Sequence, residues 1–463
     1  MDGSPGWGDR PPDFDSMRLA SLLLLLSTTA ASAAAQDPAR LQLESYQLPN
    51  GLSVVLAQDN SAQVVAVNVW YDVGSRNERP GLTGFAHLFE HMMFMGSGNV
   101  ETGQHMALIE GAGGVLNAST AEDRTNYFQV VPSNRMNLAL WLEADRMRSL
   151  DVTDANLDIQ RNAVQEERRL RVDNPPYLKL IFEYQYAVAD STSCFPYAHS
   201  VIGSMADLNA ASLDDVQEFF ATYYTPNNAT LVIAGDFDPA EARALVEQYF
   251  GGIERGPDPP PTAACNQPYS TGQVTRTVDD VNATLPAVLQ VYRAPPVTSD
   301  DYAALELLAL IMGSGESSRM HRAVVREARA AAAVQVLFNA LGLRRGPGTF
   351  SVLSIASGTV DADSLNTLVA SQFASLAAEG VTAEELAKAR NMTRATLIQE
   401  RQTAMGRAEA IHRNVLFFGS PDAINEELAR YERVTRADIQ RVAQTYLVPA
   451  NSMVFLAVPG GAR

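Results

Sequence analysis

Alternating apolar and polar residues predict β-strands in several parts of the chain. Residues 41–57 and 63–72 alternate with the period of two that puts successive side chains on opposite faces of a strand. Asn50 and Gly51 form a hairpin-type turn signal inside the first of these stretches. Further strand-like runs follow at residues 115–120, 125–131 and 230–234.

Helical periodicity separates these strands. Residues 136–150 repeat Leu, Trp and Met at helical spacing, and residues 214–223 form a shorter amphipathic helix. A long helix is predicted at residues 154–172, because the sequence Asn-Pro-Pro at 174–176 then ends it. Mixed strands and helices of this kind predict an α+β fold.

The second half of the chain repeats the first. SLDDVQEFFATYYTPNNATLVIAG from Ser212 aligns without a gap with TRADIQRVAQTYLVPANSMVFLAV from Thr435. Seven positions are identical or closely similar at this constant offset, which indicates an internal duplication. They are Asp215/Asp438, Val216/Ile439, Gln217/Gln440, Thr222/Thr445, Tyr223/Tyr446, Pro226/Pro449 and Asn228/Asn451.

The chain begins with a predicted leader and contains one predicted linker. Arg18, an apolar run and small residues up to Ala35 predict a secretory signal peptide whose true start is Met17, and therefore an exported, periplasmic or secreted protein. The proline-rich RGPDPPP from Arg255 predicts the linker between two domains. We expect a leader at 1–35, an N-terminal domain at 36–254, a linker at 255–268 and a C-terminal domain at 269–463.

Composition excludes several classes of partner. The formal net charge of −18 argues against nucleic acid and anionic membrane surfaces. No apolar run of about 18 residues follows the leader, so no membrane span is expected. Cys194 and Cys265 lack the spacing of a zinc pair and are compatible with either one disulfide or two separate thiols.

The strongest chemical signal is GFAHLFEHMMFMG, residues 84–96. His87 and His91 are four residues apart and share one face of a helix, with Glu90 beside them and Thr83 as the expected N-cap. Burying these polar groups among Phe, Leu and Met would be costly without partners, and a metal ion removes that cost. A pair of hydrogen-bonded core histidines is the alternative; ligand spacing among only six histidines favours the metal.

A zinc hydrolase site commonly has a third protein ligand. The long helix offers Glu166 and Glu167 within NAVQEERRL. Periodicity does not choose between them, because Glu166 shares a stripe with Ile159 and Leu170, whereas Glu167 shares one with Leu157 and Val164.

The H-x-x-E-H helix, the N-A-V-x-x-E context, GGxxNAxT at 113–120 and the duplication together resemble the pitrilysin/insulinase family of zinc peptidases, in particular its bacterial half-length members akin to mitochondrial processing peptidase subunits. The resemblance implies two homologous domains, each an antiparallel sheet with helices packed mainly on one face. It also implies one zinc ion held by His87, His91 and Glu167, with Glu90 as general base. An edge strand carrying Asn117, Ala118 and Thr120 would pair with the peptide substrate.

Two positions depart from the family pattern. Gln160 stands where the family often has a second glutamate, seven residues before the ligand. In SSRMHRAVVREARAAAAV, from Ser317, Arg326 matches a substrate-binding arginine, but the family's tyrosine falls on Ala332 or Ala333. We therefore expect a heterodimer with a sister chain that supplies Arg and Tyr, with a homodimer as the alternative.

The expected activity is zinc-dependent endoproteolysis of unfolded peptides or oligopeptides. Two alternatives remain open at the sequence level. One is a non-catalytic peptide-binding or assembly subunit of the same fold, and the other is a protease dedicated to maturing one peptide.

Overall fold

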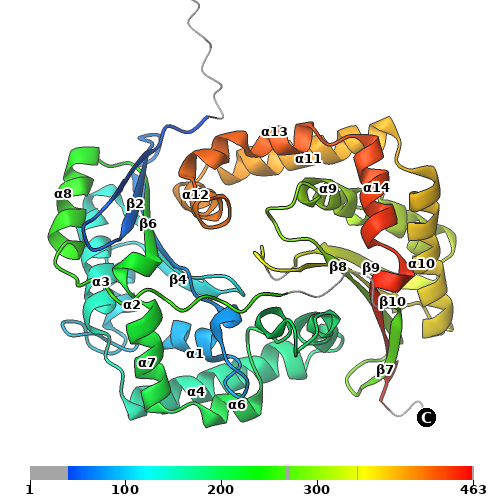
Figure 1. The fold of residues 1–463 in the computed structure, drawn as a ribbon, viewed down its shortest axis with the longest axis horizontal. Coiled ribbons are helices and arrows are strands. Elements are labelled where there is room, and N and C mark those ends of the chain that lie inside the picture. Colours follow the sequence, from blue (N-terminus) through cyan, green and yellow to red (C-terminus); the bar gives the residue numbers. More distant parts are fainter. Residues whose placement is uncertain (1–39, 266–271, 341, 461–463) are drawn as a thin grey trace, which may run out of the picture. The chain divides into compact units, whose positions relative to one another are not determined.

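Two β-sheets organise the structure, and each is built from one half of the chain (Figure 1). The computed structural model describes residues 40–265, 272–340 and 342–460; the predicted leader, 1–35, lies outside the described residues. The first sheet has the order β1-β2-β6-β3-β5-β4, and the second has the order β7-β11-β8-β10-β9. The strands are β1 Glu44–Gln47, β2 Ser53–Gln58, β3 Val64–Tyr71, β4 Val115–Thr120, β5 Thr125–Pro132, β6 Ala229–Gly235, β7 Val274–Asp280, β8 Ala287–Ala294, β9 Ala331–Phe338, β10 Gly348–Ala356 and β11 Ser452–Pro459.

Most neighbouring strands are antiparallel, as predicted, but each sheet contains one parallel pair. These pairs are β2 with β6 and β7 with β11. Parallel neighbours require a long crossover connection. In each half, the connection to the last strand includes helices that precede β6 or β11. The last strand of each half then lies between two strands that come earlier in the sequence.

The helices agree with the predicted segments in type and, to within a few residues, in position. The predicted helix at 154–172 ends as an α-helix at Arg168 and continues as a π-helical turn, Arg169–Asp173. The helices are α1 Phe85–Met92, α2 Gln104–Gly111, α3 Met136–Ser149, α4 Asp154–Arg168, α5 Leu178–Phe182, α6 Met205–Ala210, α7 Leu213–Tyr223, α8 Pro239–Phe250, α9 Tyr302–Gly313, α10 Ala362–Glu379, α11 Ala383–Glu400, α12 Ala404–Phe418, α13 Glu427–Glu432 and α14 Arg436–Tyr446.

Alternating residues of the first sheet face two different helical layers. Val54, Leu56 and Val67 pack into the larger core, which α1, α3, α7 and α8 complete. Val55 and Ala66 face the opposite side and pack against Ile411 and other residues of α12, which comes from the second half of the chain (Figure 1). Because both faces are covered, these strands are apolar on both sides.

The second sheet is covered in the reciprocal way. Its helices α9, α10 and α14 share one core with Val352 and Leu456. Its other face, including Leu289 and Phe455, packs against Leu180 and Val188 of the first half. Each half therefore covers a sheet face of the other, and the chain from Leu41 onward forms one compact unit. The predicted domain boundary at 255–268 stays a prediction.

The predicted duplication extends to individual hydrogen bonds. Capping boxes start α7 at Ser212 and α14 at Thr435. Asn228 Nδ2 donates to Tyr223 O at 2.8 Å, and Asn451 Nδ2 donates to the equivalent Tyr446 O at 2.7 Å. The two halves thus repeat the same helix, turn and strand.

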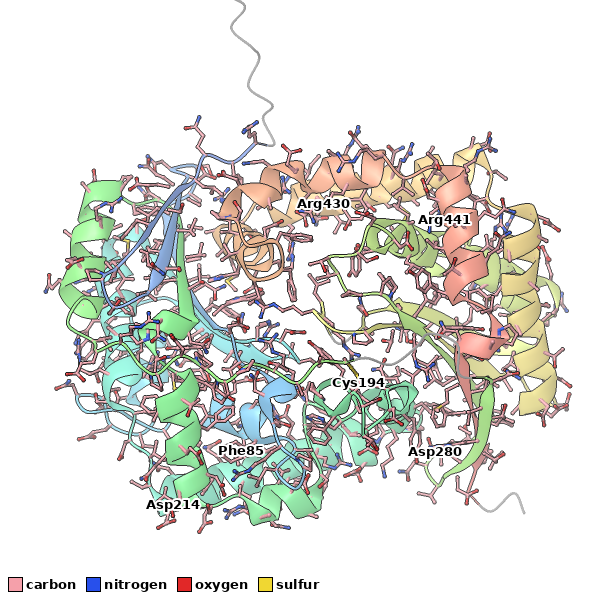
Figure 2. The ribbon with its side chains drawn as sticks, in the orientation of Figure 1. Phe85, Cys194, Asp214, Asp280, Arg430 and Arg441 are labelled. Atoms are coloured by element: carbon pink, nitrogen blue, oxygen red, sulfur yellow. A yellow bond between two sulfur atoms is a disulfide. The ribbon has the colours of Figure 1, made fainter. Side chains whose placement is uncertain are left out.

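Cys194, labelled in Figure 2, forms a disulfide with Cys265. The two Cα atoms are 4.4 Å apart, and Cys194 is buried. Of the two alternatives that the sequence left open, the structure contains the disulfide. It ties the proline-rich segment after Arg255 back to the first half.

Candidate metal centre

The helix that carries the H-x-x-E-H motif begins at a glycine rather than at Thr83. Gly84 is the N-cap of α1 with φ of +85°, and a Cβ there would lie 2.6 Å from Ile202 O. The carboxylate of Glu78 accepts hydrogen bonds from Gly84 N at 2.9 Å and Ala86 N at 2.8 Å. The N-cap prediction for Thr83 was wrong, because its hydroxyl donates to Asp207 instead and Glu78 satisfies the free amides.

The structure brings His87, His91 and Glu167 together. Glu167 Oε2 lies 3.6 Å from His87 Nε2 and 3.3 Å from His91 Nε2. Donor atoms bound tetrahedrally to zinc at about 2.0–2.1 Å are separated by roughly 3.4 Å. Among the residues that the structure describes, this is the one group of three His, Cys or carboxylate side chains close enough to share a metal ion. The donor set therefore fits zinc.

The fold decides between the two adjacent glutamates. Glu166 points to solvent with 58% of its side chain exposed and pairs with Arg169 at 3.0 Å. Glu167 is only 18% exposed, and its second oxygen, Oε1, pairs with Arg171 NH1 at 2.7 Å. One turn of α4 packed against α1 thus orients Glu167, and not Glu166, toward the histidines.

Both histidines direct Nε2 toward Glu167, but their pKa values shift in opposite directions. Burial acts to lower the pKa of His91, but its hydrogen bond with Glu167 and the charge of Glu90 outweigh burial and raise it. His91 Nδ1 donates to Gln160 Oε1 at 3.1 Å, so Nε2 is the nitrogen that faces the other candidate ligands. Burial lowers the pKa of His87 to about 4, with His91 as a further cause, so this imidazole is neutral near pH 7. Gln160, the departure from the family pattern, therefore contacts a candidate ligand directly. Its amide oxygen is a weaker acceptor than a carboxylate would be.

Glu90 stands beside the three candidate ligands. It is 9% exposed, and Thr120 Oγ1 donates to its Oε2 at 2.6 Å. Burial raises the pKa of Glu90, while the hydrogen bond from Thr120 opposes that rise. A buried carboxylate with one oxygen held and the other free can accept a proton from water and release it again.

A cleft of about 480 Å³ opens over the candidate metal ligands. One wall is β4, which pairs with β5 on one side and is the edge strand of its sheet. Asn117, Ala118 and Thr120 all line the cleft. An edge strand offers backbone amides and carbonyls to an added strand.

Several cleft residues were not identified from the sequence. Arg171 lies one helical turn beyond Glu167, and that spacing was a usable signal. Phe182, Tyr186 and Ser200 also line the cleft but come from short helices and a loop about 90 to 110 residues after α1, which no periodicity connects to it.

The predicted substrate-binding arginine is not brought to this cleft. Arg326 lies in a π-helical turn, His321–Glu327, where it is exposed, and it does not line the cleft. Ala332 and Ala333, the two candidate positions of the missing tyrosine, are exposed on β9.

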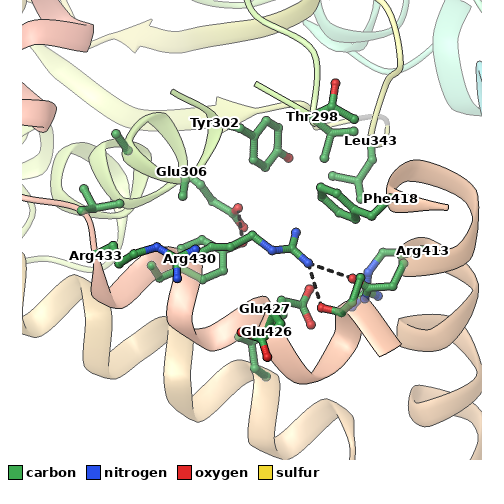
Figure 3. Close-up of a pocket in the computed structure, with 18 of the residues that line it drawn as sticks. Thr298, Tyr302, Glu306, Leu343, Arg413, Phe418, Glu426, Glu427, Arg430 and Arg433 are labelled. Atoms are coloured by element: carbon green, nitrogen blue, oxygen red, sulfur yellow. Dashed lines mark hydrogen bonds between the residues drawn. The ribbon is translucent and has the colours of Figure 1, made fainter. Parts of the chain in front are cut away.

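A larger cavity of about 1130 Å³ lies in the second half, between α9, α12 and α13 (Figure 3). Several of its charged and polar side chains have partners within the chain. Arg430 donates to Asn414 Oδ1 at 2.9 Å, Tyr431 donates to Glu306 at 2.6 Å, and Arg413 pairs with Glu400 at 2.5 Å. These contacts stabilise the packing of the helices around the cavity, so the side chains that make them have a structural role.

Two family models match the chain in succession. "Insulinase (Peptidase family M16)" matches residues 53–190, and "Peptidase M16 inactive domain" matches residues 210–393. The first contains the candidate metal ligands, and the second covers most of the repeat that lacks them. The chain therefore belongs to peptidase family M16, the insulinase family.

Among related proteins, the chain is 29% identical over 443 residues to the zinc protease PqqE of Helicobacter pylori, covering 95% of this chain and 98% of that protein. It is 26% identical over 412 residues to a probable mitochondrial-processing peptidase subunit beta of Arabidopsis thaliana, covering 86% of this chain and 75% of that protein. The predicted resemblance to the family is confirmed.

Solved structures agree on the fold. A protease from Helicobacter pylori superposes with a TM-score of 0.85 at 27% identity, covering 91% of this chain and all of the other. The periplasmic protease PqqL from Escherichia coli superposes with a TM-score of 0.72 at 17% identity, and the match covers 90% of this chain but 47% of PqqL. The α+β fold of two homologous halves is therefore confirmed. No helix in the described part of the chain is long and apolar enough to cross a membrane.

Proposed function

We propose that this protein is a zinc-dependent endopeptidase subunit that hydrolyses unfolded peptides. The observation that carries the proposal is the convergence of His87, His91 and Glu167 beside Glu90, in a cleft whose wall is a free strand edge. No other cluster of ligating side chains in the described ranges competes with it.

Each residue has a defined part in the proposed reaction. A zinc ion held by the three ligands would act as a Lewis acid on a peptide carbonyl and on water. Glu90 accepts the proton of the attacking water on its free oxygen and returns it to the leaving amine. Thr120 holds the other oxygen of Glu90, which fixes the direction of the proton transfer.

Substrate recognition would use β4. An extended peptide can add to this edge by main-chain hydrogen bonds, which do not depend on side chains and therefore admit many sequences. Asn117 and Ala118 lie beside the candidate metal ligands and would hold the residues that flank the cleaved bond.

We further propose that a second, related chain completes the site. Arg326 does not line the cleft, and no tyrosine occurs between Tyr302 and Tyr431. A lost oxyanion donor lowers turnover on the order of a hundredfold or more. A sister chain that supplies Arg and Tyr would restore it, with a homodimer as the alternative.

Export is part of the same proposal. The disulfide between Cys194 and Cys265 suits an oxidising compartment, as does the leader predicted upstream.

The test compares four forms of the chain from Gln36 onward: wild type, Glu90→Gln, Glu167→Gln and Glu166→Gln. Wild type and Glu90→Gln should each bind one zinc, because Glu90 is not a ligand. Glu167→Gln should lose zinc affinity at least about tenfold, whereas its neighbour Glu166→Gln should not. Zinc content is measured by elemental analysis, and cleavage is followed with a quenched unstructured peptide, with and without chelator.

Cleavage by wild type, alone or with a sister chain, that chelation and Glu90→Gln both abolish would support the proposal. Equal zinc loss in Glu166→Gln and Glu167→Gln would contradict the assigned ligand set. A chain that binds peptides but never cleaves them would favour the non-catalytic alternative.

A further inference from the structure

The turn that follows β4 is held by the other half of the chain. This turn contains Glu122 and Asp123, both completely buried. The β9–β10 turn of the second half, residues 342–347, carries Arg344 and Arg345 against it. The two turns occupy equivalent places, since each connects the edge strand of its sheet to the next strand.

The contact between these turns consists of charged hydrogen bonds. Arg344 NH2 donates to Glu122 Oε1 at 2.5 Å, and both side chains are at most 2% exposed. Arg345 N donates to Asp123 Oδ2 at 3.1 Å. The Arg345 guanidinium reaches this turn indirectly. It donates to both oxygens of Asp72, at 2.8 and 2.9 Å, and Arg76 pairs with both Asp72 and Asp123. A buried pair of this kind is strongly destabilised when one partner is removed, so the turns are held in one arrangement.

The same turn adjoins the candidate catalytic groups. Thr120, whose hydroxyl donates to Glu90, is the last residue of β4 and lies two positions before Glu122. Tyr186, which lines the cleft, donates its hydroxyl to Glu122 Oε1 at 2.8 Å. The guanidinium carbon of Arg344 lies 5.1 Å from the centre of the Tyr186 ring. Glu122 therefore joins Arg344 to both a wall of the cleft and the end of β4.

We propose that Arg344 and Arg345 are positioning residues, through which the second half fixes β4, Thr120 and Tyr186 for peptide cleavage at the first half's site. The inference rests on the proposed peptidase function. In this proposal the second half of the chain, which lacks the candidate metal ligands, helps to set the geometry of the site in the first half. A displacement of about 1 Å in a reacting group can lower turnover a hundredfold, so loss of either arginine would act mainly on kcat.

The variants are Arg344→Met, which removes a fully buried charge, and Arg345→Met at a position that is 33% exposed and more tolerant of change. Arg344→Lys and Arg345→Lys keep the charge. Arg401→Met is the matched control, because Arg401 pairs with Glu427 at 2.8 Å inside the second half, away from both turns. All are made in the full chain from Gln36 onward.

Three quantities are measured well below the unfolding temperature: zinc content, kcat and KM for a quenched peptide, and hydrogen exchange of amides 115–120. In Arg345→Met we expect full zinc content, kcat lowered about tenfold or more, KM changed less, and faster exchange in β4. The lysine variants should recover part of kcat. Arg401→Met should keep kcat within about twofold and leave exchange in β4 unchanged.

Wild-type kcat in folded Arg345→Met would overturn the proposal, as would an equal loss in Arg401→Met. If Arg344→Met does not fold, Arg344→Lys tests the direct contact with Glu122, and Arg345→Met tests the route through Asp72 and Arg76. If wild type cleaves no peptide, either alone or with a sister chain, the proposed function fails. Unchanged exchange at 115–120 in Arg345→Met would separately overturn the coupling between the turns and β4.

Discussion

Individual residues set the chemistry of the candidate site through contacts that leave little choice of orientation. His91 donates to Gln160, Thr120 donates to Glu90, and Arg171 pairs with one oxygen of Glu167. In each contact the bonded atom is one that the proposed zinc ion or water would not contact. The remaining nitrogen or oxygen of each side chain is therefore left for the proposed metal ion or water.

The bond from Thr120 to Glu90 gives a residue-level prediction. Thr120→Val removes the hydroxyl but keeps the shape of the side chain, so the Glu90 carboxylate loses its orienting donor. A hydrogen bond to a charged group is worth about 1.5–3 kcal/mol, and we expect kcat to fall roughly tenfold or more with zinc content unchanged. Steady-state cleavage kinetics and elemental analysis measure both.

Thr120→Ser is the matched control, because it retains the hydroxyl and should keep most of kcat. If Thr120→Val cleaves as fast as Thr120→Ser, then the orienting role of Thr120 is wrong.

Helices and strands in this chain carry strong local signals for where they begin and end. The capping boxes at Ser212 and Thr435 start equivalent helices, and Asp215 and Asp438 complete them by accepting from the backbone amides of Ser212 and Thr435. These signals act over three residues, so they operate before tertiary structure forms. The start of α1 differs, because Glu78 caps it from outside the helix.

The duplicated capping boxes give an element-level prediction. Ser212→Ala and Thr435→Ala should each lower the free energy of unfolding by about 1 kcal/mol, because each leaves a helix N-terminal amide without its side-chain acceptor. The two sites lie in different halves, so the double variant should show the sum. Urea unfolding followed by circular dichroism measures the three values.

Ser212→Thr and Thr435→Ser retain a capping hydroxyl and serve as controls that should stay within a few tenths of a kcal/mol of wild type. An effect at one site and none at the other would show that the two starts are not equivalent in energy.

At the scale of the whole molecule, the two halves depend on each other. Helix α12 covers the face of the first sheet that includes Val55 and Ala66, and Leu180 with Val188 covers the second sheet. The buried ion pair between Glu122 and Arg344 crosses between the halves as well. Separation would expose both apolar faces and leave a buried carboxylate without its cation.

We therefore expect residues 36–268 expressed alone to aggregate, because the sheet face that α12 covers would be an exposed apolar patch. Co-expression with residues 269–463 should recover a soluble complex. Size-exclusion chromatography and circular dichroism distinguish these outcomes. A monomeric, cooperatively folding first half would contradict the expected dependence.

The sequence by itself determined the elements, the duplication, the family and the spacing of His87, Glu90 and His91. These properties depend on local periodicity, turn residues and helix geometry, all of which act over a few positions. The resemblance to the family also supplied Glu167, which periodicity could not separate from Glu166.

Only the tertiary structure decided the rest. The glycine start of α1 depends on Ile202 O, the disulfide depends on the path of the segment before Cys265, and the contact between the two turns joins residues 222 positions apart. Such contacts arise from packing between distant segments, which no local pattern encodes. For that reason the sequence indicated the spacing of the candidate ligands, while only the fold showed that the second half contacts the turn after β4.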